Sequence, residues 1–250
     1  MKYGMDFDVR SYEIDSRSII KPSVIFQYMQ ESMEAQMKDS DVGYHDLHDK
    51  KRLAFILSRM TVEIFKPIKQ WDKIRVYTWC EKSKGAIYPR YHEFILDNEV
   101  VIKASAVWGL INIDSREIVL ADEYDLGGYP IDRKLEMNIP NRVRIPKDIE
   151  FNHVERTEVR YSKIDINGHI NNTIYPDMLY DVIPSIENYN ITSINMRYVS
   201  EAKFGDVIDI YLSDLLDPDK YDVRADKIAY VYSKIGDSKN VEATFGLKRR

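Results

Sequence analysis

The densest group of polar residues in the chain is the segment from Asp165 to Asn172, which reads Asp-Ile-Asn-Gly-His-Ile-Asn-Asn. Asp165, Asn167 and His169 alternate with other residues, so an extended backbone would direct these three side chains to one side. A carboxylate, an amide and an imidazole on one side can orient a water molecule and move a proton. Asp, Asn and Gly also form ordinary loops before helices, and the local pattern alone is more typical of such a loop.

A helix is predicted directly after this segment, near residues 173–183, because apolar residues recur there with helical spacing. Asn171 or Asn172 is expected to cap its N-terminus. Unpaired N–H groups and the positive end of the helix dipole would stabilise a carbonyl oxygen that gains charge in a reaction. The segment therefore predicts an oxyanion site beside the polar group.

Two other sets of residues offer chemistry, and a structural explanation is preferred for both. His45 and His48 lie near Asp46 and Asp49 at a spacing that metals use, but no further Cys or His cluster accompanies them, which favours a solvated loop. Cys80 lies in an alternating strand pattern typical of a half-buried apolar residue. We therefore expect neither a metal nor a cofactor.

The elements that would position the polar segment occur twice along the chain. A long amphipathic helix is predicted from Pro22 onward, and strand patterns follow it, among them residues 73–80 and 100–110. Residues 130–146 contain three prolines and little periodicity, which indicates a linker. A second strand, loop, helix and set of strands follow, and residues 205–211 match residues 71–77 in pattern, which indicates an internal duplication.

Composition restricts the class of protein. The 250 residues include 36 Lys and Arg against 41 Asp and Glu, a net charge of −5, which disfavours a general attraction to nucleic acid or anionic membrane. No apolar run reaches the ~18 residues of a membrane span, and the first residues lack the apolar core of a secretory signal. With one cysteine the chain cannot form an internal disulfide, so we expect a cytoplasmic protein.

The motif Asp-x-Asn-x-His-x-Asn-Asn-x-x-Tyr at residues 165–175 resembles the second-domain motif of acyl-acyl carrier protein thioesterases. Other landmarks of that family precede the motif in the expected order, so the resemblance covers nearly the whole chain. They are Met29-Gln30-Glu31, Ser58-Arg59-Met60, Pro67, Tyr77-Thr78-Trp79, Arg90 and the segment from Ser105 to Trp108.

The resemblance implies an α+β fold, a tandem double hot-dog in which two antiparallel sheets each wrap around a long central helix. It implies an N-terminal hot-dog domain at 1–130 with the acyl-chain pocket, a linker at 131–150 and a C-terminal hot-dog domain at 151–250 with the catalytic residues. The implied activity is hydrolysis of fatty acyl-acyl carrier protein to free fatty acid, which ends chain elongation.

The resemblance also implies the site residues. Glu201 matches the family's acid and is expected to be the base, with Asp165, Asn167 and His169 orienting the water and the thioester. His169 is equally able to carry the proton, with Glu201 setting its charge. Ala202 stands where plant members have cysteine, so a cysteine nucleophile is excluded at this position and direct attack by water is expected.

The same family places the first helix beside the acyl chain, so Met29 and Met33 are expected to border that pocket, although such residues are usually plain core. The expected partner is acyl carrier protein, an acidic protein that needs a locally basic face. Candidates for that face are Lys147, Arg156, Arg160 and Lys163, which scattered solubilising charge explains equally well.

Two other activities of hot-dog folds stay open, a hydroxyacyl dehydratase and a non-catalytic acyl-CoA-binding regulator. The regulator is the weaker alternative, because the sequence shows no DNA-binding element before the first strand. Whether two chains pair as a homodimer is left undecided by the sequence.

Overall fold

The computed structural model describes residues 2–40, 43, 45–123, 131–218 and 222–250. The strands of the first half are β1 (Tyr3–Asp8), β2 (Leu53–Ile64), β3 (Lys73–Cys80), β4 (Tyr88–Leu96), β5 (Glu99–Asn112) and β6 (Ile118–Val119). Those of the second half are β7 (Phe151–Glu158), β8 (Tyr189–Tyr198), β9 (Val207–Ser213), β10 (Lys227–Ile235) and β11 (Ser238–Arg249). The helices are α1 (Pro22–Asp39) and α2 (Tyr175–Tyr180), with short turns of helix η1 (Asp46–Lys50), η2 (Tyr161–Lys163) and η3 (Ile186–Asn188).

The described residues form one antiparallel sheet of 11 strands in the order β1-β3-β4-β5-β2-β8-β11-β10-β9-β7, with β6 paired to β5 outside that path. From each outer edge to the centre, the first-half order β1-β3-β4-β5-β2 repeats as β7-β9-β10-β11-β8. The turns before β3 and β9 also match, because Trp71 and Gly205 both have positive φ, 72° and 85°. The predicted internal duplication is therefore confirmed.

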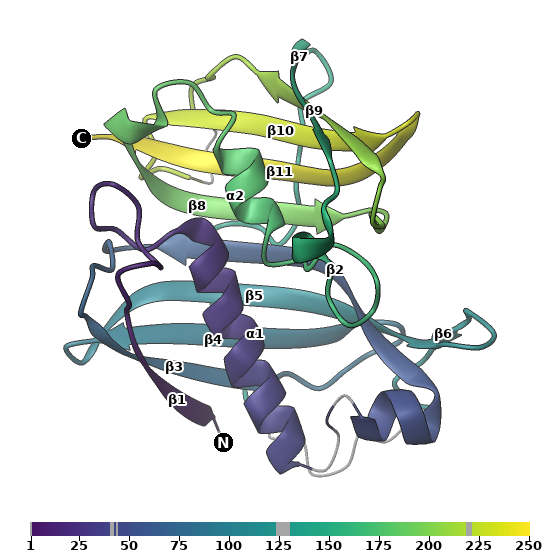
Figure 1. The fold of residues 1–250 in the computed structure, drawn as a ribbon. Coiled ribbons are helices and arrows are strands. Elements are labelled where there is room, and N and C mark those ends of the chain that lie inside the picture. The colour runs from purple at the N-terminus through teal and green to yellow at the C-terminus, as the bar shows by residue number, and fades with distance from the viewer. Residues whose placement is uncertain (1, 41–42, 44, 124–130, 219–221) are drawn as a thin grey trace.

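The join between the halves differs from the predicted pair of sheets. β2 and β8 pair in antiparallel register from Arg59 opposite Arg197 to Glu63 opposite Ser193, so the two sets of strands make a single sheet. β2 and β8 are edge strands within their own halves, and an unpaired strand edge is stabilised by another strand. The sheet is therefore continuous through the molecule, as Figure 1 shows.

The second predicted helix is also shorter than expected. α2 covers six residues, whereas the apolar pattern predicted a helix over 173–183. Its first turn contains Pro176, and Pro184 disfavours helical backbone at the preceding residue, which ends the helix early. Among the described residues, the only long helix is α1, which lies across the strands of the first half (Figure 1).

α1 buries one face against this sheet, as its spacing predicts. Phe26 and Met29 are at most 1% exposed, and Pro22 occupies the first turn, where its missing N–H costs nothing. The core that contains these residues extends through both halves and includes Val62 of β2 and Ile194 of β8, both fully buried. No helix in the described part of the chain has the length and apolar character needed to cross a membrane.

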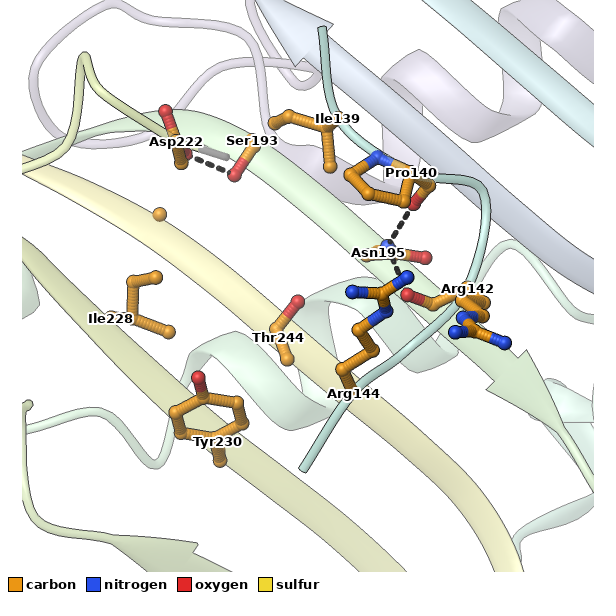
Figure 2. A pocket seen from close by; sticks show the side chains of 11 residues that line it. Ile139, Pro140, Arg142, Arg144, Ser193, Asn195, Asp222, Ile228, Tyr230 and Thr244 are labelled. Atoms are coloured by element: carbon orange, nitrogen blue, oxygen red, sulfur yellow. Dashed lines mark hydrogen bonds between the residues drawn. The ribbon is translucent and has the colours of Figure 1, made fainter. Parts of the chain in front are cut away.

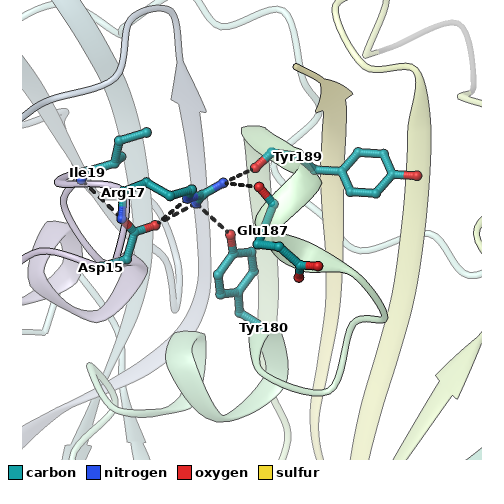
Figure 3. Close-up of polar contacts among 6 residues, drawn as sticks. All are labelled: Asp15, Arg17, Ile19, Tyr180, Glu187 and Tyr189. Atoms are coloured by element: carbon teal, nitrogen blue, oxygen red, sulfur yellow. Dashed lines mark hydrogen bonds and ion pairs between the residues drawn. The ribbon is translucent and has the colours of Figure 1, made fainter.

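Arg17 connects the N-terminal loop to the second half (Figure 3). Its guanidinium donates to the carboxylate of Asp15 (2.7 Å), to the hydroxyl of Tyr180 (3.2 Å) and to the carbonyl oxygens of Glu187 and Tyr189. The side chain is only 12% exposed. We call this group the Arg17 cluster; it holds α2 and the start of β8 against the first half.

On the face of the sheet opposite to α1 and α2, part of the segment predicted as a linker lies over β8 and β11 (Figure 2). Asn195 of β8 donates to the carbonyl oxygens of Pro140 (2.8 Å) and Arg142 (3.0 Å). Glu63, which is fully buried, accepts from the N–H of Ile139 at 2.6 Å. Residues 124–130, the end of the predicted first domain, lie outside the described residues.

We predict that Arg17→Met lowers the free energy of unfolding by about 2–4 kcal/mol, because it removes the guanidinium partner of Asp15 Oδ2 and the donor to the part-buried acceptors of Tyr180 and Tyr189. Urea unfolding measures this. Arg75→Met is the control, because its ion pair with Asp6 has side chains 47% and 72% exposed and should contribute less than about 1 kcal/mol. Equal effects of the two substitutions would contradict the role given to Arg17.

Candidate active site

The polar segment forms a tight loop between η2 and α2. The N–H of Asp165 donates to the carbonyl oxygen of His169 (2.9 Å), and the N–H of Gly168 donates to that of Asp165 (3.0 Å). Gly168 has φ of 80°, a left-handed conformation that favours glycine. The carboxylate of Asp165 accepts from the N–H of Asn167 at 2.8 Å. Asp165 therefore shapes the loop that presents the other polar groups.

The loop places His169 beside Glu201. Ile170 donates its N–H to the carbonyl oxygen of Ala202 (2.9 Å), and His169 forms an isolated bridge with Lys203. As a result, Nε2 of His169 lies 3.2 Å from Oε2 of Glu201. The His169 side chain is 18% exposed and that of Glu201 53%, so the carboxylate is the more open of the two to water.

This pair opens into a cavity of about 610 Å³, which we call the candidate catalytic cavity. All four residues predicted to be catalytic line it: Asp165, Asn167, His169 and Glu201. The facing wall comes from the first half, namely the start of β2 from Ala54 to Ser58, the end of β5, and Arg116. A molecule in this cavity would therefore contact both halves of the chain.

The predicted helix cap is wrong, whereas the oxyanion site at the start of the helix stays a prediction. Asn171 Oδ1 accepts from the N–H (2.9 Å) and the hydroxyl (2.8 Å) of Thr173, so it closes a turn ahead of the helix. The residue before α2 is Ile174, which supplies no side-chain cap, and Pro176 in the first turn has no N–H to donate. Neither Asn171 nor Asn172 therefore caps α2.

Two tyrosines complete the inner wall of the cavity. Tyr175 is the last residue of the sequence motif, and burial raises its pKa to about 12, so its hydroxyl is protonated at neutral pH. Tyr198 packs edge-on against it with ring centres 5.9 Å apart and donates to the carbonyl oxygen of Asn172 (3.0 Å). Tyr198, Arg116 and the β2 residues were not predicted, because no local pattern marks them and only the β2–β8 pairing brings them to the site.

The structure also brings Met29 and Met33 close to this region. Both are buried on α1 and line a narrow cavity of about 20 Å³ together with Leu57, His92 and other residues. Leu57 and Asn172 line both this narrow cavity and the candidate catalytic cavity. The predicted acyl-pocket residues thus lie directly beyond the wall that the two cavities share.

The other reactive residues have structural partners. His45 and His48 both approach Asp49 through Nδ1, at 2.9 and 2.8 Å. Within the described ranges, no three His, Cys, Asp or Glu side chains are arranged to hold a metal ion. Cys80 is half-buried on β3 away from the candidate catalytic cavity, and burial raises its pKa.

Of the predicted carrier-binding residues, Lys147, Arg156 and Arg160 are exposed and Lys163 is half-buried. Arg156 lies on β7, the edge strand that leads to the loop, and Lys163 closes η2 immediately before it. Arg160 pairs with Glu158 (3.2 Å), whereas Lys147 lies in the linker segment. Their use by a partner stays a prediction.

Comparison with known proteins decides the family. The model of the acyl-ACP thioesterase N-terminal domain matches residues 1–123, and that of the acyl-ACP thioesterase C-terminal domain matches residues 146–243. The chain belongs to the acyl-ACP thioesterase family. It is 27% identical over 229 residues to oleoyl-acyl carrier protein thioesterase 1 of Arabidopsis thaliana, with 84% of this chain and 63% of the plant protein covered.

Solved structures share the fold. A crystal structure of an acyl-ACP thioesterase from Bacteroides thetaiotaomicron superposes with a TM-score of 0.84 at 22% identity, covering 98% of this chain and 97% of the other. The 12:0-ACP thioesterase from Umbellularia californica gives a TM-score of 0.82 at 17% identity, covering 100% and 94%. The α+β architecture with its extended antiparallel sheet is therefore that of acyl-ACP thioesterase structures.

His92, beside the narrow cavity, gives a test by pH. Its Nε2 donates to the carbonyl oxygen of Met29 (3.1 Å), and burial together with the nearby Arg90 charge lowers its pKa from 6.5 to about 3. Between these values the unfolded chain binds a proton that the folded chain does not, so stability is lost as pH falls from 6.5 toward 3.

We predict that acid lowers the free energy of unfolding of the wild type more steeply than that of His92→Gln, which keeps an N–H donor and does not titrate. The difference in slope should approach about 1.4 kcal/mol per pH unit. Urea titrations at a series of pH values provide the measurement. Parallel profiles would show that His92 is not buried as a neutral group.

Proposed function

We propose that this protein is an acyl-acyl carrier protein thioesterase, which hydrolyses the thioester of a fatty acyl-acyl carrier protein to free fatty acid and the carrier thiol. One observation carries the proposal: the carboxylate of Glu201 lies 3.2 Å from Nε2 of His169 in a cavity walled by both halves of the chain. Membership of the acyl-ACP thioesterase family supports the substrate class.

Glu201 is the proposed base. It is the more exposed member of the pair and can take a proton from a water molecule in the cavity. The water oxygen then bonds to the thioester carbonyl carbon, the carbon–sulfur bond breaks, and the leaving thiolate takes up the proton from Glu201, which restores the carboxylate. His169, whose Nε2 atom lies 3.2 Å from Oε2 of Glu201, is the proposed positioning residue for this carboxylate.

No cysteine competes for this role at the neighbouring position. Ala202 is 1% exposed and has no nucleophilic atom, which supports direct attack by water. Asp165 acts by holding the loop in its conformation through the Asn167 N–H, and Asn167 lies on the cavity wall where it can orient the thioester.

We infer that the first half binds the acyl chain and the second half supplies the catalytic residues. Residues 1–130 are the N-terminal hot-dog domain with the acyl pocket beside Met29 and Met33, residues 131–150 are the linker, and residues 151–250 are the C-terminal hot-dog domain with the catalytic residues. The repeated strand order supports this double hot-dog, joined through β2 and β8. The chain spans only 63% of the length of the plant relative. We therefore base the proposed activity on the residues of this chain and not on the activity of the relative.

The proposed partner is acyl carrier protein. Its acidic surface would meet Arg156, Arg160 and Lys163, which flank the catalytic loop, and Lys147 in the linker segment. Cytoplasm is the proposed compartment, in keeping with a chain that has a single cysteine.

We predict that Glu201→Gln lowers kcat at least about 100-fold, because the amide cannot accept the proton of the water. If His169 only positions Glu201, His169→Ala should lower kcat less than Glu201→Gln does. If His169 carries the proton, the two substitutions should lower kcat equally. Hydrolysis is followed by released thiol and free acid, with the exposed Glu150→Gln as the control variant. An active Glu201→Gln/His169→Ala double variant would exclude this site, and an enoyl product without free thiol would indicate a dehydratase.

We predict that Met29→Phe shifts the preferred acyl chain to shorter lengths, because the larger side chain fills the narrow cavity beyond Leu57. A series of acyl-carrier thioesters, with the free acids identified, measures the shift. Met37→Phe is the matched control, since Met37 is also buried on α1 but lies outside that cavity. An unchanged product profile for Met29→Phe would argue against this acyl pocket.

A further inference from the structure

The first half of the chain contains a second copy of the catalytic loop, at residues 15–20. The N–H of Asp15 donates to the carbonyl oxygen of Ile19 (2.7 Å), as Asp165 does to His169, and Ser18 donates to Asp15 as Gly168 does to Asp165. The carboxylate of Asp15 accepts from the N–H of Arg17 at 2.8 Å. Even the left-handed backbone repeats, with φ of 61° at Ser18.

The segment beside this loop repeats as well. Ile20 donates its N–H to the carbonyl oxygen of Ile68 (2.9 Å), and Ile19 forms an isolated bridge with Lys69. In the second half, Ile170, Ala202, His169 and Lys203 form the same contacts. Ile19 therefore occupies the place of His169, Arg17 that of Asn167, and Pro67 that of Glu201. The first copy keeps the backbone of the site and its loop aspartate, Asp15, but has neither the imidazole of His169 nor the carboxylate of Glu201.

A separate cavity of about 140 Å³ lies at this first copy. Its interior is mainly isoleucine, so we call it the isoleucine cavity; its lining includes Ile19, Ile20, Ile25, Ile68, Ile102 and Ile191. Apolar cavities of roughly 150 Å³ are known to bind benzene-sized molecules. This one has room for a short aliphatic segment.

The charges around the isoleucine cavity are opposite in sign to those of the candidate catalytic cavity. Arg17, Lys66 and Lys248 line it, and Asp15 is the one acidic residue among its described lining residues. Lys66 and Lys248 are exposed at its rim, where Lys66 also forms an exposed ion pair with Glu99. By contrast, the catalytic cavity is lined by two carboxylates, Asp165 and Glu201, and one guanidinium, Arg116. A carboxylate is attracted to the first group of charges and repelled by the second.

One polar group inside the isoleucine cavity also lacks a partner. The Oδ1 atom of Asn190 is buried and makes no hydrogen bond in the described part of the chain. Because amide oxygen and nitrogen are interchanged by a flip of the side chain, Asn190 can present either an acceptor or a donor to a ligand. A buried amide without a partner is costly, and a polar ligand group would remove that cost.

We propose that the isoleucine cavity binds a free fatty acid, with the start of the aliphatic tail among the isoleucines and the carboxylate between Lys66 and Lys248. If the proposed function holds, this ligand is the product that the other copy of the loop releases. The two copies of the loop then serve two purposes: the copy that holds His169 beside Glu201 hydrolyses the thioester, and the copy beside Lys66 and Lys248 binds the acid.

Isothermal titration of the full chain with octanoate, and with octanol as the uncharged match, tests the proposal. Lys66→Glu/Lys248→Glu should weaken octanoate binding about tenfold or more and change octanol binding little, because only the carboxylate meets the cations. Ile19→Trp, which fills the cavity from the half-buried loop, should weaken binding of both ligands. Lys82→Glu, an exposed lysine elsewhere, should leave both unchanged.

Met29→Phe distinguishes octanoate binding in the isoleucine cavity from binding at the catalytic cavity. If octanoate binds in the isoleucine cavity, this substitution should leave its affinity intact. Octanoate affinity unchanged in both Lys66→Glu/Lys248→Glu and Ile19→Trp would overturn the proposal. Hydrolysis of an acyl-carrier thioester, measured in parallel, should persist in the lysine double variant. Failure of hydrolysis with intact octanoate binding would refute the proposed function and leave this site standing.

Discussion

The antiparallel pairing of β2 with β8 is the contact on which the rest of the structure depends. On its inner side Val62 and Ile194 are fully buried in the core shared by both halves. On its outer side Thr61 donates to Asn195 (3.1 Å), and Asn195 in turn holds the linker segment. Apolar burial on one face and satisfied hydrogen bonds on the other make this join part of the interior rather than a surface contact. Both walls of the candidate catalytic cavity follow from it.

The two copies of the loop share a backbone conformation and differ in most of their side chains. Asp15 and Asp165 hold the two copies in the same backbone conformation through equivalent hydrogen bonds. The difference lies in what the loop presents: an imidazole beside a carboxylate in the second half, and an isoleucine beside a proline in the first. The same loop conformation therefore occurs in each half, and the side chains on the loop determine the chemistry at that position.

Much of this arrangement was predictable from the sequence, and the failures have a common cause. Local periodicity correctly placed β3 and the start of α1 at Pro22. The motif supplied His169 and the family resemblance supplied Glu201, and both line one cavity in the structure. The single sheet and the contribution of the β2 residues depend on pairing between distant strands, which local patterns do not encode. Apolar spacing predicts a longer α2 than the structure has, because this spacing does not register the effects of Pro176 and Pro184 on helical backbone.

The central claim is that a water molecule, activated by Glu201 beside His169, attacks the thioester directly in a cavity that both halves form. A single turnover of an acyl-carrier thioester in water enriched in a heavy oxygen isotope measures this most directly. We predict one labelled oxygen in each free acid, one thiol released per acid, and no change in the mass of the protein. Unlabelled acid, a labelled Glu201 or a covalent acyl-protein would contradict it.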